Sequence, residues 1–165
     1  MKNCKTLTLK QGEYWFSGII DDTIRMPYTE KSEVLSCASF HPYFTGVSSD
    51  ERGAKTVLQG LQTPYGVAAT DFDRGHFQWG YPNGWAPLHY VAAVALKNCG
   101  LTEDAKIVAR AYCDTVESCF EKSGRLFEKY NMQTGTSDTL DEYELPHMLG
   151  WSAGVFLALL HDFIS

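Results

Sequence analysis

Aromatic, amide and carboxylate side chains gather in three separate segments of the sequence. The first segment, residues 78–87, contains Gln78, Trp79, Tyr81, Asn83 and Trp85. The second, residues 127–131, contains Glu128, and the third, residues 141–144, contains Glu142. Aromatic rings offer flat apolar faces on which a sugar ring can stack, while amides and carboxylates hydrogen-bond sugar hydroxyls. These side-chain types therefore indicate a carbohydrate-binding site.

Each segment also has a purely structural interpretation. Residues 78–87 could form an aromatic turn that packs on the next helix, because aromatic residues mostly belong to cores. Glu128 alone could be a solvated acid near a helix end, and residues 141–144 could be a solvated acidic loop. Trp151 begins an apolar stretch, where a core position and a sugar-stacking position are both compatible with its type. The residue types alone leave both interpretations open.

The remaining reactive side chains favour neither a metal nor an organic cofactor. None of the five histidines has a metal-ligand spacing such as His-Glu-x-x-His. Those near the three segments, His41, His76, His89 and His147, are interpreted as structural. The sequence contains no Gly-rich phosphate loop and no nucleophile elbow. We therefore expect a site that works with side chains alone.

Helices separated by long loops must position the three segments. Apolar spacing and boundary residues predict helices over residues 32–46, 49–60, 86–99, 102–122 and 148–164. The intervening residues 61–85 and 123–147 are predicted to be loops, and loops of this length are usually functional. The last helix is almost wholly apolar, so we expect it to lie inside a packed core.

The composition is that of one soluble globular domain. Of the 165 residues, 44% are hydrophobic and 21% are charged. The net charge of -6 and the lack of a Lys/Arg run argue against nucleic-acid binding. The longest nearly uncharged stretch, residues 150–160, is too short for a membrane span, which needs about 20 apolar residues. Five cysteines without a CxxC pair, and no recognisable signal peptide, predict a cytoplasmic protein.

The order of four motifs resembles the C-terminal part of the trehalases, the family thirty-seven glycoside hydrolases. The motifs are residues 78–87 (Gln-Trp-Gly-Tyr-Pro-Asn-Gly-Trp-Ala-Pro), 128–130 (Glu-Lys-Tyr), 142–143 (Glu-Tyr) and 150–155 (Gly-Trp-Ser-Ala-Gly-Val). The match extends from about Ser32 to Leu160 and includes residues 34–38 and 66–70. The Trp-Ser-Ala helix start also resembles family sixty-three glucosidases and mannosylglycerate hydrolases.

The resemblance implies an all-α fold, namely the C-terminal portion of an (α/α)6 toroid. Residues 32–165 would form one incomplete domain of this toroid, and residues 1–31 would be a weakly matched N-terminal segment. The predicted helices amount to less than half of such a toroid. Because a partial toroid leaves apolar helix faces uncovered, we expect the chain to self-associate or to be completed by an upstream chain.

The resemblance also implies an activity. It is the inverting hydrolysis of an α-linked glucose disaccharide, such as α,α-trehalose, by two carboxyl groups and without a cofactor. Glu128 corresponds to the general base of the family. The expected sugar-binding residues are Gln78, Trp79, Asn83, Gly84, Trp85, Glu142 and Trp151. A related α-glucosidase or mannosylglycerate hydrolase-like activity is the alternative, because the signature Asp of the family is Gly80 here.

The general acid of the family has no counterpart in the sequence. The family carries this acid in a Trp-Asp-x-Ser-x-Arg-Trp stretch, which is absent here. Asp21 and Asp22 are the only carboxyl pair near the N-terminus, and their surroundings do not match. Three alternatives stay open: a piece of a trehalase-like enzyme completed by another chain, a remnant without activity, and a helical interaction domain with no sugar role.

Overall fold

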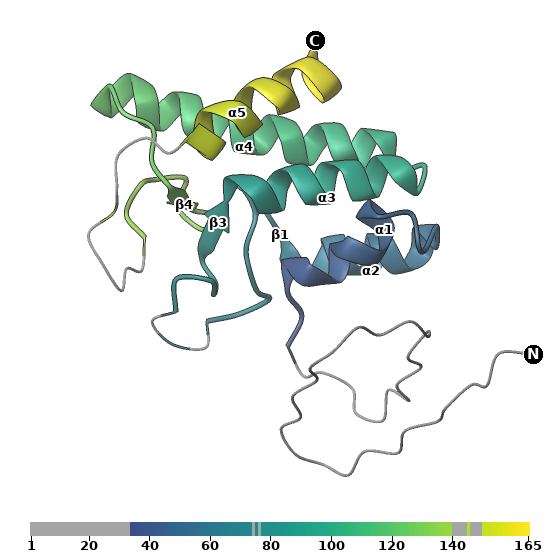
Figure 1. Ribbon diagram of the computed structural model, residues 1–165. Helices are drawn as coiled ribbons and strands as arrows, with labels where there is room; N and C mark the ends of the chain where they lie inside the picture. Colours follow the sequence, from purple (N-terminus) through teal and green to yellow (C-terminus); the bar gives the residue numbers. More distant parts are fainter. Residues whose placement is uncertain (1–33, 74, 76, 140–144, 146–149) are drawn as a thin grey trace, which may run out of the picture. The chain divides into compact units, whose positions relative to one another are not determined.

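Helices make up most of the described chain. The computed structural model describes residues 34–73, 75, 77–139, 145 and 150–165. The helical elements are η1 (Cys37–Phe40), α1 (His41–Phe44), α2 (Glu51–Leu61), α3 (Ala86–Asn98), α4 (Thr102–Ser123), α5 (Gly150–Leu159) and η2 (Leu160–Ile164), shown in Figure 1. The predicted helices over residues 49–60, 86–99, 102–122 and 148–164 correspond to α2, α3, α4 and α5 with η2. The predicted helical fold is therefore confirmed.

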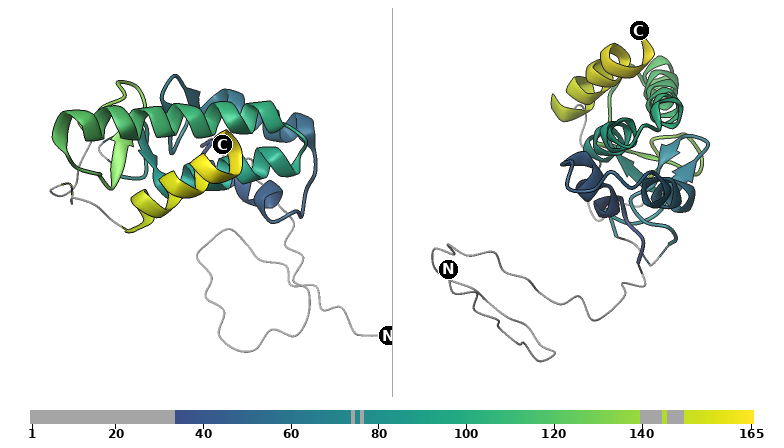
Figure 2. Two further views of the ribbon diagram at one scale, coloured as in Figure 1. Left: turned by 90° about the horizontal axis from the view of Figure 1, so that it is seen from above. Right: turned by 90° about the vertical axis from the view of Figure 1, so that its right-hand side faces the viewer.

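An antiparallel hairpin of α3 and α4 organises the helices (Figures 1 and 2). Alanines at 92, 93 and 95 of α3 are fully buried, and their small side chains let α3 pack closely against α1, α4 and α5. The turn between α3 and α4 depends on Gly100, whose φ of 81° lies in the left-handed region that favours glycine. The N–H of Leu101 then donates to the Leu96 carbonyl over 2.9 Å and closes the turn.

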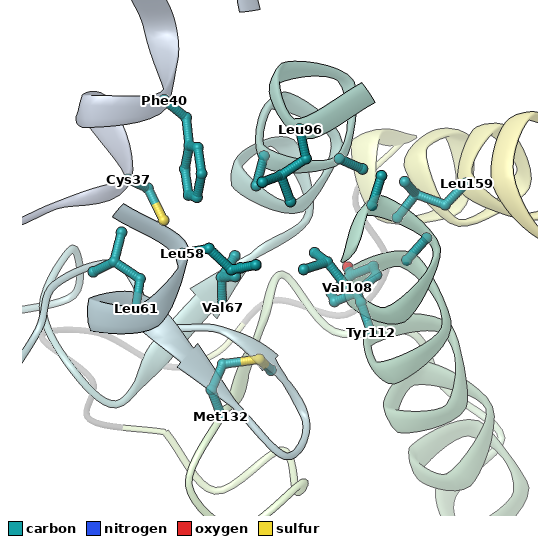
Figure 3. Packing of buried hydrophobic residues seen from close by; sticks show 14 of the residues in the cluster. Cys37, Phe40, Leu58, Leu61, Val67, Leu96, Val108, Tyr112, Met132 and Leu159 are labelled. Carbon is teal, nitrogen blue, oxygen red and sulfur yellow. The ribbon is translucent and has the colours of Figure 1, made fainter. Parts of the chain in front are cut away.

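Within the described residues, one hydrophobic core joins the helices to the loops (Figure 3). Large, fully buried side chains of this core come from six elements and from one loop: Phe40, Leu58, Leu61, Val67, Leu96, Tyr112, Met132 and Leu159. Val67 and Met132 belong to segments that were predicted to be loops, and both are fully buried. The core therefore fixes these segments against the helices.

Residues 34–46 differ from the single helix predicted over residues 32–46. Ser36 is extended, with φ -138° and ψ 165°, and pairs in an isolated antiparallel bridge with Thr70. The N–H of Cys37 donates to the Ala69 carbonyl over 3.0 Å, so this stretch is tied to a distant segment of the chain. The helical prediction is wrong at its start because a long-range backbone pairing overrides local helix propensity.

The two predicted loops contain short antiparallel ladders that the sequence analysis missed. Strand β1 (Gln62–Thr63) pairs with β2 (Gly66–Val67), and β3 (Asn83–Trp85) pairs with β4 (Lys129–Asn131). In Figure 1, β3 and β4 lie side by side at the end of the hairpin where α3 begins and α4 ends. Strands of two or three residues are too short to show an alternating pattern, so the sequence gives little signal for them.

The last helix is correctly predicted, but its expected burial is wrong. Between Gly150 and Ser165 only Ser152, Leu159 and Phe163 are buried, and Leu157 is 64% exposed. A groove of about 560 Å³ runs between α4 and α5. It is lined by Val116, Glu117, Phe120, Glu121, Leu126, Ala153, Phe156 and Leu157. One face of α5 packs on α3 and α4, and the described residues do not cover the other. None of the described helices has the length and apolarity needed to cross a membrane.

Candidate active site

The β3–β4 ladder brings two of the three predicted site segments together. Its register places Asn83 opposite Asn131, Gly84 opposite Tyr130, and Trp85 opposite Lys129. Side chains of directly opposed residues lie on the same face of an antiparallel pair. Glu128 immediately precedes this ladder, so the carboxylate predicted to be the base lies next to the predicted sugar-binding segment.

The Glu128 carboxylate is mostly buried and is paired with a buried lysine. Glu128 is 9% exposed, and its Oε2 lies 3.7 Å from Nζ of Lys129, whose side chain is fully buried. An ionised carboxylate is stable in such a place only when it is paired or hydrogen-bonded. The ion pair with Lys129 contributes to keeping a charged carboxylate in this partly dry position.

The backbone before Glu128 is held on both sides by hydroxyl groups. The N–H of Phe127 donates to Oη of Tyr130 over 3.1 Å, and Oγ of Ser152 donates to the Phe127 carbonyl over 2.8 Å. Burial raises the pKa of Tyr130 to about 12, against the opposing effect of the Phe127 N–H, so its hydroxyl stays neutral. These two hydrogen bonds connect Glu128 to β4 and to the first turn of α5.

Three tryptophans form a cluster beside the carboxylate. The rings of Trp79 and Trp85 stack with centroids 4.0 Å apart and an interplanar angle of 4°. Trp151 meets Trp85 edge to face at 5.8 Å and 90°. Trp85 is 1% exposed, whereas Trp79 is 48% and Trp151 is 39% exposed. Trp85 is therefore the buried centre of the cluster, and Trp79 and Trp151 are the rings that a sugar could reach.

Gln78, Asn83 and Gly84 shape the loop that carries Trp79. The Gln78 carbonyl accepts hydrogen bonds from Trp85 Nε1 over 2.9 Å and from Asn83 Nδ2 over 3.1 Å. Asn83 is fully buried, and a Cβ on Gly84 would collide with Met132. The geometry thus gives Asn83 and Gly84 a positioning role, and leaves the half-buried Gln78 side chain closest to solvent. Glu142, the remaining sugar-binding prediction, lies outside the described residues.

His89 contacts the backbone of Trp85 in the tryptophan cluster and is a structural histidine, as predicted. Its Nε2 accepts the N–H of Val67 over 2.9 Å, and its Nδ1 donates to the Trp85 carbonyl over 2.8 Å. Its ring stacks on Tyr112 with centroids 4.1 Å apart. Full burial lowers the pKa of His89 to about 4, although the bond to the Trp85 carbonyl opposes this effect. His89 is therefore neutral in the folded chain above this pH.

Acidification should destabilise the chain through His89. A histidine in the unfolded chain binds a proton below about 6.5, whereas His89 in the fold resists protonation down to about 4. The free energy of unfolding is therefore expected to fall by about 3 kcal/mol between these pH values. Urea unfolding at a series of pH values measures this dependence. The His89→Gln variant should show a shallower dependence, and an equal slope in both proteins would refute the role of His89.

Two residues of the site were missed by the sequence analysis. Lys129 lies inside the Glu-Lys-Tyr motif and Ser152 inside the Trp-Ser-Ala-Gly motif, and the sequence analysis assigned neither a role. The sequence signal for Lys129 is its neighbour Glu128, because a lysine is almost never fully buried unless it is paired. Ser152 gives no such signal, since its partner is a backbone carbonyl far away in sequence.

A metal site is not formed by the described part of the chain. Among residues 34–73, 75, 77–139, 145 and 150–165, no group of three His, Cys, Asp or Glu side chains could hold a metal ion. The chemistry available to these residues is that of a carboxylate, a neighbouring ammonium group and aromatic rings. A carboxylate of this kind can accept a proton from a water molecule.

The helical hairpin is consistent with a portion of the (α/α)6 toroid of the six-hairpin glycosidases. The chain belongs to the trehalase family, whose family model matches residues 15–164. It is 36% identical over 134 residues to the periplasmic trehalase of Xanthomonas oryzae pv. oryzae, covering 79% of this chain and 23% of that protein. It is 39% identical over 134 residues to the periplasmic trehalase of Pseudomonas aeruginosa, covering 78% and 24%.

A solved structure shares the fold. Neutral trehalase Nth1 from Saccharomyces cerevisiae matches 81% of this chain and 24% of its own length, with a TM-score of 0.62 and 22% identity. The chain thus spans about a quarter of the length of the relatives that it matches. This similarity supports the expected portion of an (α/α)6 toroid.

The expected cytoplasmic location is contradicted by the comparisons. The similar proteins from Xanthomonas oryzae pv. oryzae, Pseudomonas aeruginosa and Xanthomonas axonopodis pv. citri are all named periplasmic trehalases. The expectation was based on cysteine count and on the first residues of the sequence, and neither feature determines a compartment. The free cysteines are compatible with this correction, because Cys37, Cys99, Cys113 and Cys119 are all buried in the fold.

Proposed function

We propose that this chain provides the general-base part of an active site that hydrolyses α,α-trehalose with inversion. The observation that carries the proposal is the placement of Glu128. Its carboxylate is mostly buried, paired with Lys129, and fixed beside the stacked Trp79 and Trp85 by the β3–β4 ladder. The trehalase names of the relatives supply the substrate class.

The reaction follows from the chemistry of two opposed carboxyl groups. Glu128 accepts a proton from a water molecule while the water oxygen bonds to the anomeric carbon. The bond from that carbon to the bridging oxygen breaks, and a carboxylic acid on the opposite face protonates the leaving oxygen. Two glucose molecules result. Because the chain spans about a quarter of its relatives, we assign this acid to a part of the toroid outside residues 34–165.

The tryptophans supply the sugar-binding surface in this proposal. One face of Trp79 is covered by Trp85, and its exposure of 48% leaves the other face open to a glucose ring. Trp151 stands at a right angle to Trp85 and offers a second wall. Ring faces at two orientations fit a disaccharide whose two sugar rings are not coplanar.

A hybrid enzyme tests the proposal. In this hybrid, the matching 134-residue segment of the Pseudomonas aeruginosa periplasmic trehalase is replaced by the corresponding residues of this chain. We expect the hybrid to release glucose from trehalose. Maltose and mannosylglycerate serve as competing substrates and test the alternative specificities. A hybrid that folds, as judged by its thermal melt, and cleaves none of these substrates would support the remnant interpretation and contradict the proposal.

The uncovered face of α5 predicts self-association of the chain on its own. Leu157 is 64% exposed, and the half-exposed Phe120 lines the same groove between α4 and α5. We propose that further toroid helices cover this face in a complete enzyme. Without them, burial against a second copy is the available way to remove apolar surface from water. Light scattering should show oligomers whose size falls in Leu157→Glu, and a monodisperse monomer of the unchanged chain would contradict this.

A further inference from the structure

Lys129 is an unusual residue for the place it occupies. Its side chain is fully buried, whereas lysine is one of the residue types that is almost never fully buried unless paired. Moving an ammonium group out of water is costly, and apolar residues of similar volume often replace a buried ion pair without loss of stability. Apolar residues in place of both Lys129 and Glu128 would therefore fill this space at lower cost, so packing alone does not explain the pair.

The charge of Lys129 lies between two groups of the proposed site. Nζ is 3.7 Å from Oε2 of Glu128 and 5.1 Å from the centroid of the Trp85 ring. The register explains the second contact, because Lys129 is the cross-strand partner of Trp85 in the β3–β4 ladder. A cation at this distance is attracted to the electron-rich face of an indole ring. One ammonium group thus contacts both the carboxylate and the buried centre of the tryptophan cluster.

We propose that Lys129 is a positioning residue that fixes the Glu128 carboxylate relative to the Trp85–Trp79 stack. The inference rests on the proposed role of Glu128 as general base. The ring of Trp85 stacks on Trp79, on which a sugar would stack in turn. The Lys129 ammonium group lies over the Trp85 ring and forms an ion pair with Glu128. A base must be aimed at its water within a fraction of an ångström, and a displacement of about 1 Å can cost a hundredfold in rate.

The kinetic test compares two lysine substitutions in the hybrid enzyme. Lys129→Met keeps the length of the side chain and removes its charge. We expect kcat for trehalose to fall about a hundredfold, because the Glu128 carboxylate loses its orientation toward the attacking water. KM should change less than about twofold, because the contacts with the substrate remain. Lys97→Met is the matched control, since Lys97 also lies over an aromatic ring, 5.3 Å from the centroid of Phe163, but in a different part of the fold. Its kinetics should be unchanged.

A second readout needs no activity and uses the full chain. Tryptophans are labelled with 5-fluorotryptophan, and the Trp85 resonance is assigned by its loss in Trp85→Phe. We expect this resonance to shift in Lys129→Met, and also in Glu128→Gln, because losing the carboxylate lets the ammonium group move over the ring. It should not shift in Lys97→Met. If Lys129 were purely structural, Lys129→Met would lower the melting temperature. The Trp85 resonance would then stay unchanged in Glu128→Gln.

The outcomes separate the two proposals. Two results would overturn the role of Lys129: an unchanged kcat in Lys129→Met, or a Trp85 resonance that does not shift in Glu128→Gln. Either result leaves the proposed base role of Glu128 standing. Turnover retained in Glu128→Gln would instead refute the base. The coupled fluorine shifts would then show that Lys129 positions the two side chains without serving hydrolysis.

Discussion

We expect Glu128→Gln in the hybrid enzyme to lower kcat for trehalose by at least about a thousandfold and to leave KM within about twofold. The amide has nearly the size of the carboxylate and cannot accept a proton from water. The sugar-facing rings of Trp79 and Trp151 are not altered, so substrate binding is retained. Steady-state kinetics with a coupled glucose assay measures both parameters.

The control for Glu128→Gln uses the charge of the neighbouring Lys129. Glu128→Gln leaves the ammonium group of Lys129 beside a neutral amide, which is expected to lower the melting temperature. The double variant Glu128→Gln, Lys129→Met removes this charge as well and should regain stability without regaining turnover. Recovered turnover in the double variant, or substantial turnover in Glu128→Gln, would show that Glu128 is not the base.

Trp85→Ala should destabilise the chain by about 3 to 5 kcal/mol, the range for deleting a large buried aromatic side chain. Trp85 is 1% exposed and contacts Trp79, Trp151 and Lys129. Its indole N–H also holds the Gln78 carbonyl, and this hydrogen bond is lost in the variant. Urea unfolding of the full chain, followed by circular dichroism, measures the loss.

Trp79→Ala is the matched control for this second substitution. Trp79 belongs to the same stack but is 48% exposed, so its removal leaves a smaller cavity and should cost less than about 1 kcal/mol. The same variant in the hybrid should raise KM for trehalose, because the sugar platform is gone. Equal losses of stability in the two variants would contradict the division into a buried centre and an exposed platform.

The helices were predictable because their signals are local. Alanine and leucine at helical spacing predict α3, and Gly100 predicts its end. The burial of α5 was not predictable in this way. Its apolar side chains are suited to a core, but the neighbouring elements that would bury them are not among the described residues. Composition indicates what a helix can bury, whereas the surrounding fold determines what it does bury.

The roles of the site residues stay a prediction, and their geometry could not be predicted from the sequence. The motif order pointed to Glu128 and to the tryptophans, and the structure brings Glu128, Trp79, Trp85 and Trp151 to one place. The ladder that joins them has three residues in each strand and leaves no alternating pattern to detect. The positions of Gly84 and Asn83 depend on the packing of Gly84 against Met132, which is distant in sequence, and on the hydrogen bond from Asn83 to the Gln78 carbonyl.

The stereochemistry of the glucose released by the hybrid enzyme tests the central claim most directly. Proton NMR at early times distinguishes α-glucose from β-glucose before the two forms interconvert. If Glu128 activates water opposite the leaving oxygen, each trehalose gives one β-glucose from the attacked ring and one α-glucose from the leaving ring. Equal initial amounts are therefore the predicted result. Release of α-glucose alone would mean retention, and would contradict a general base at Glu128.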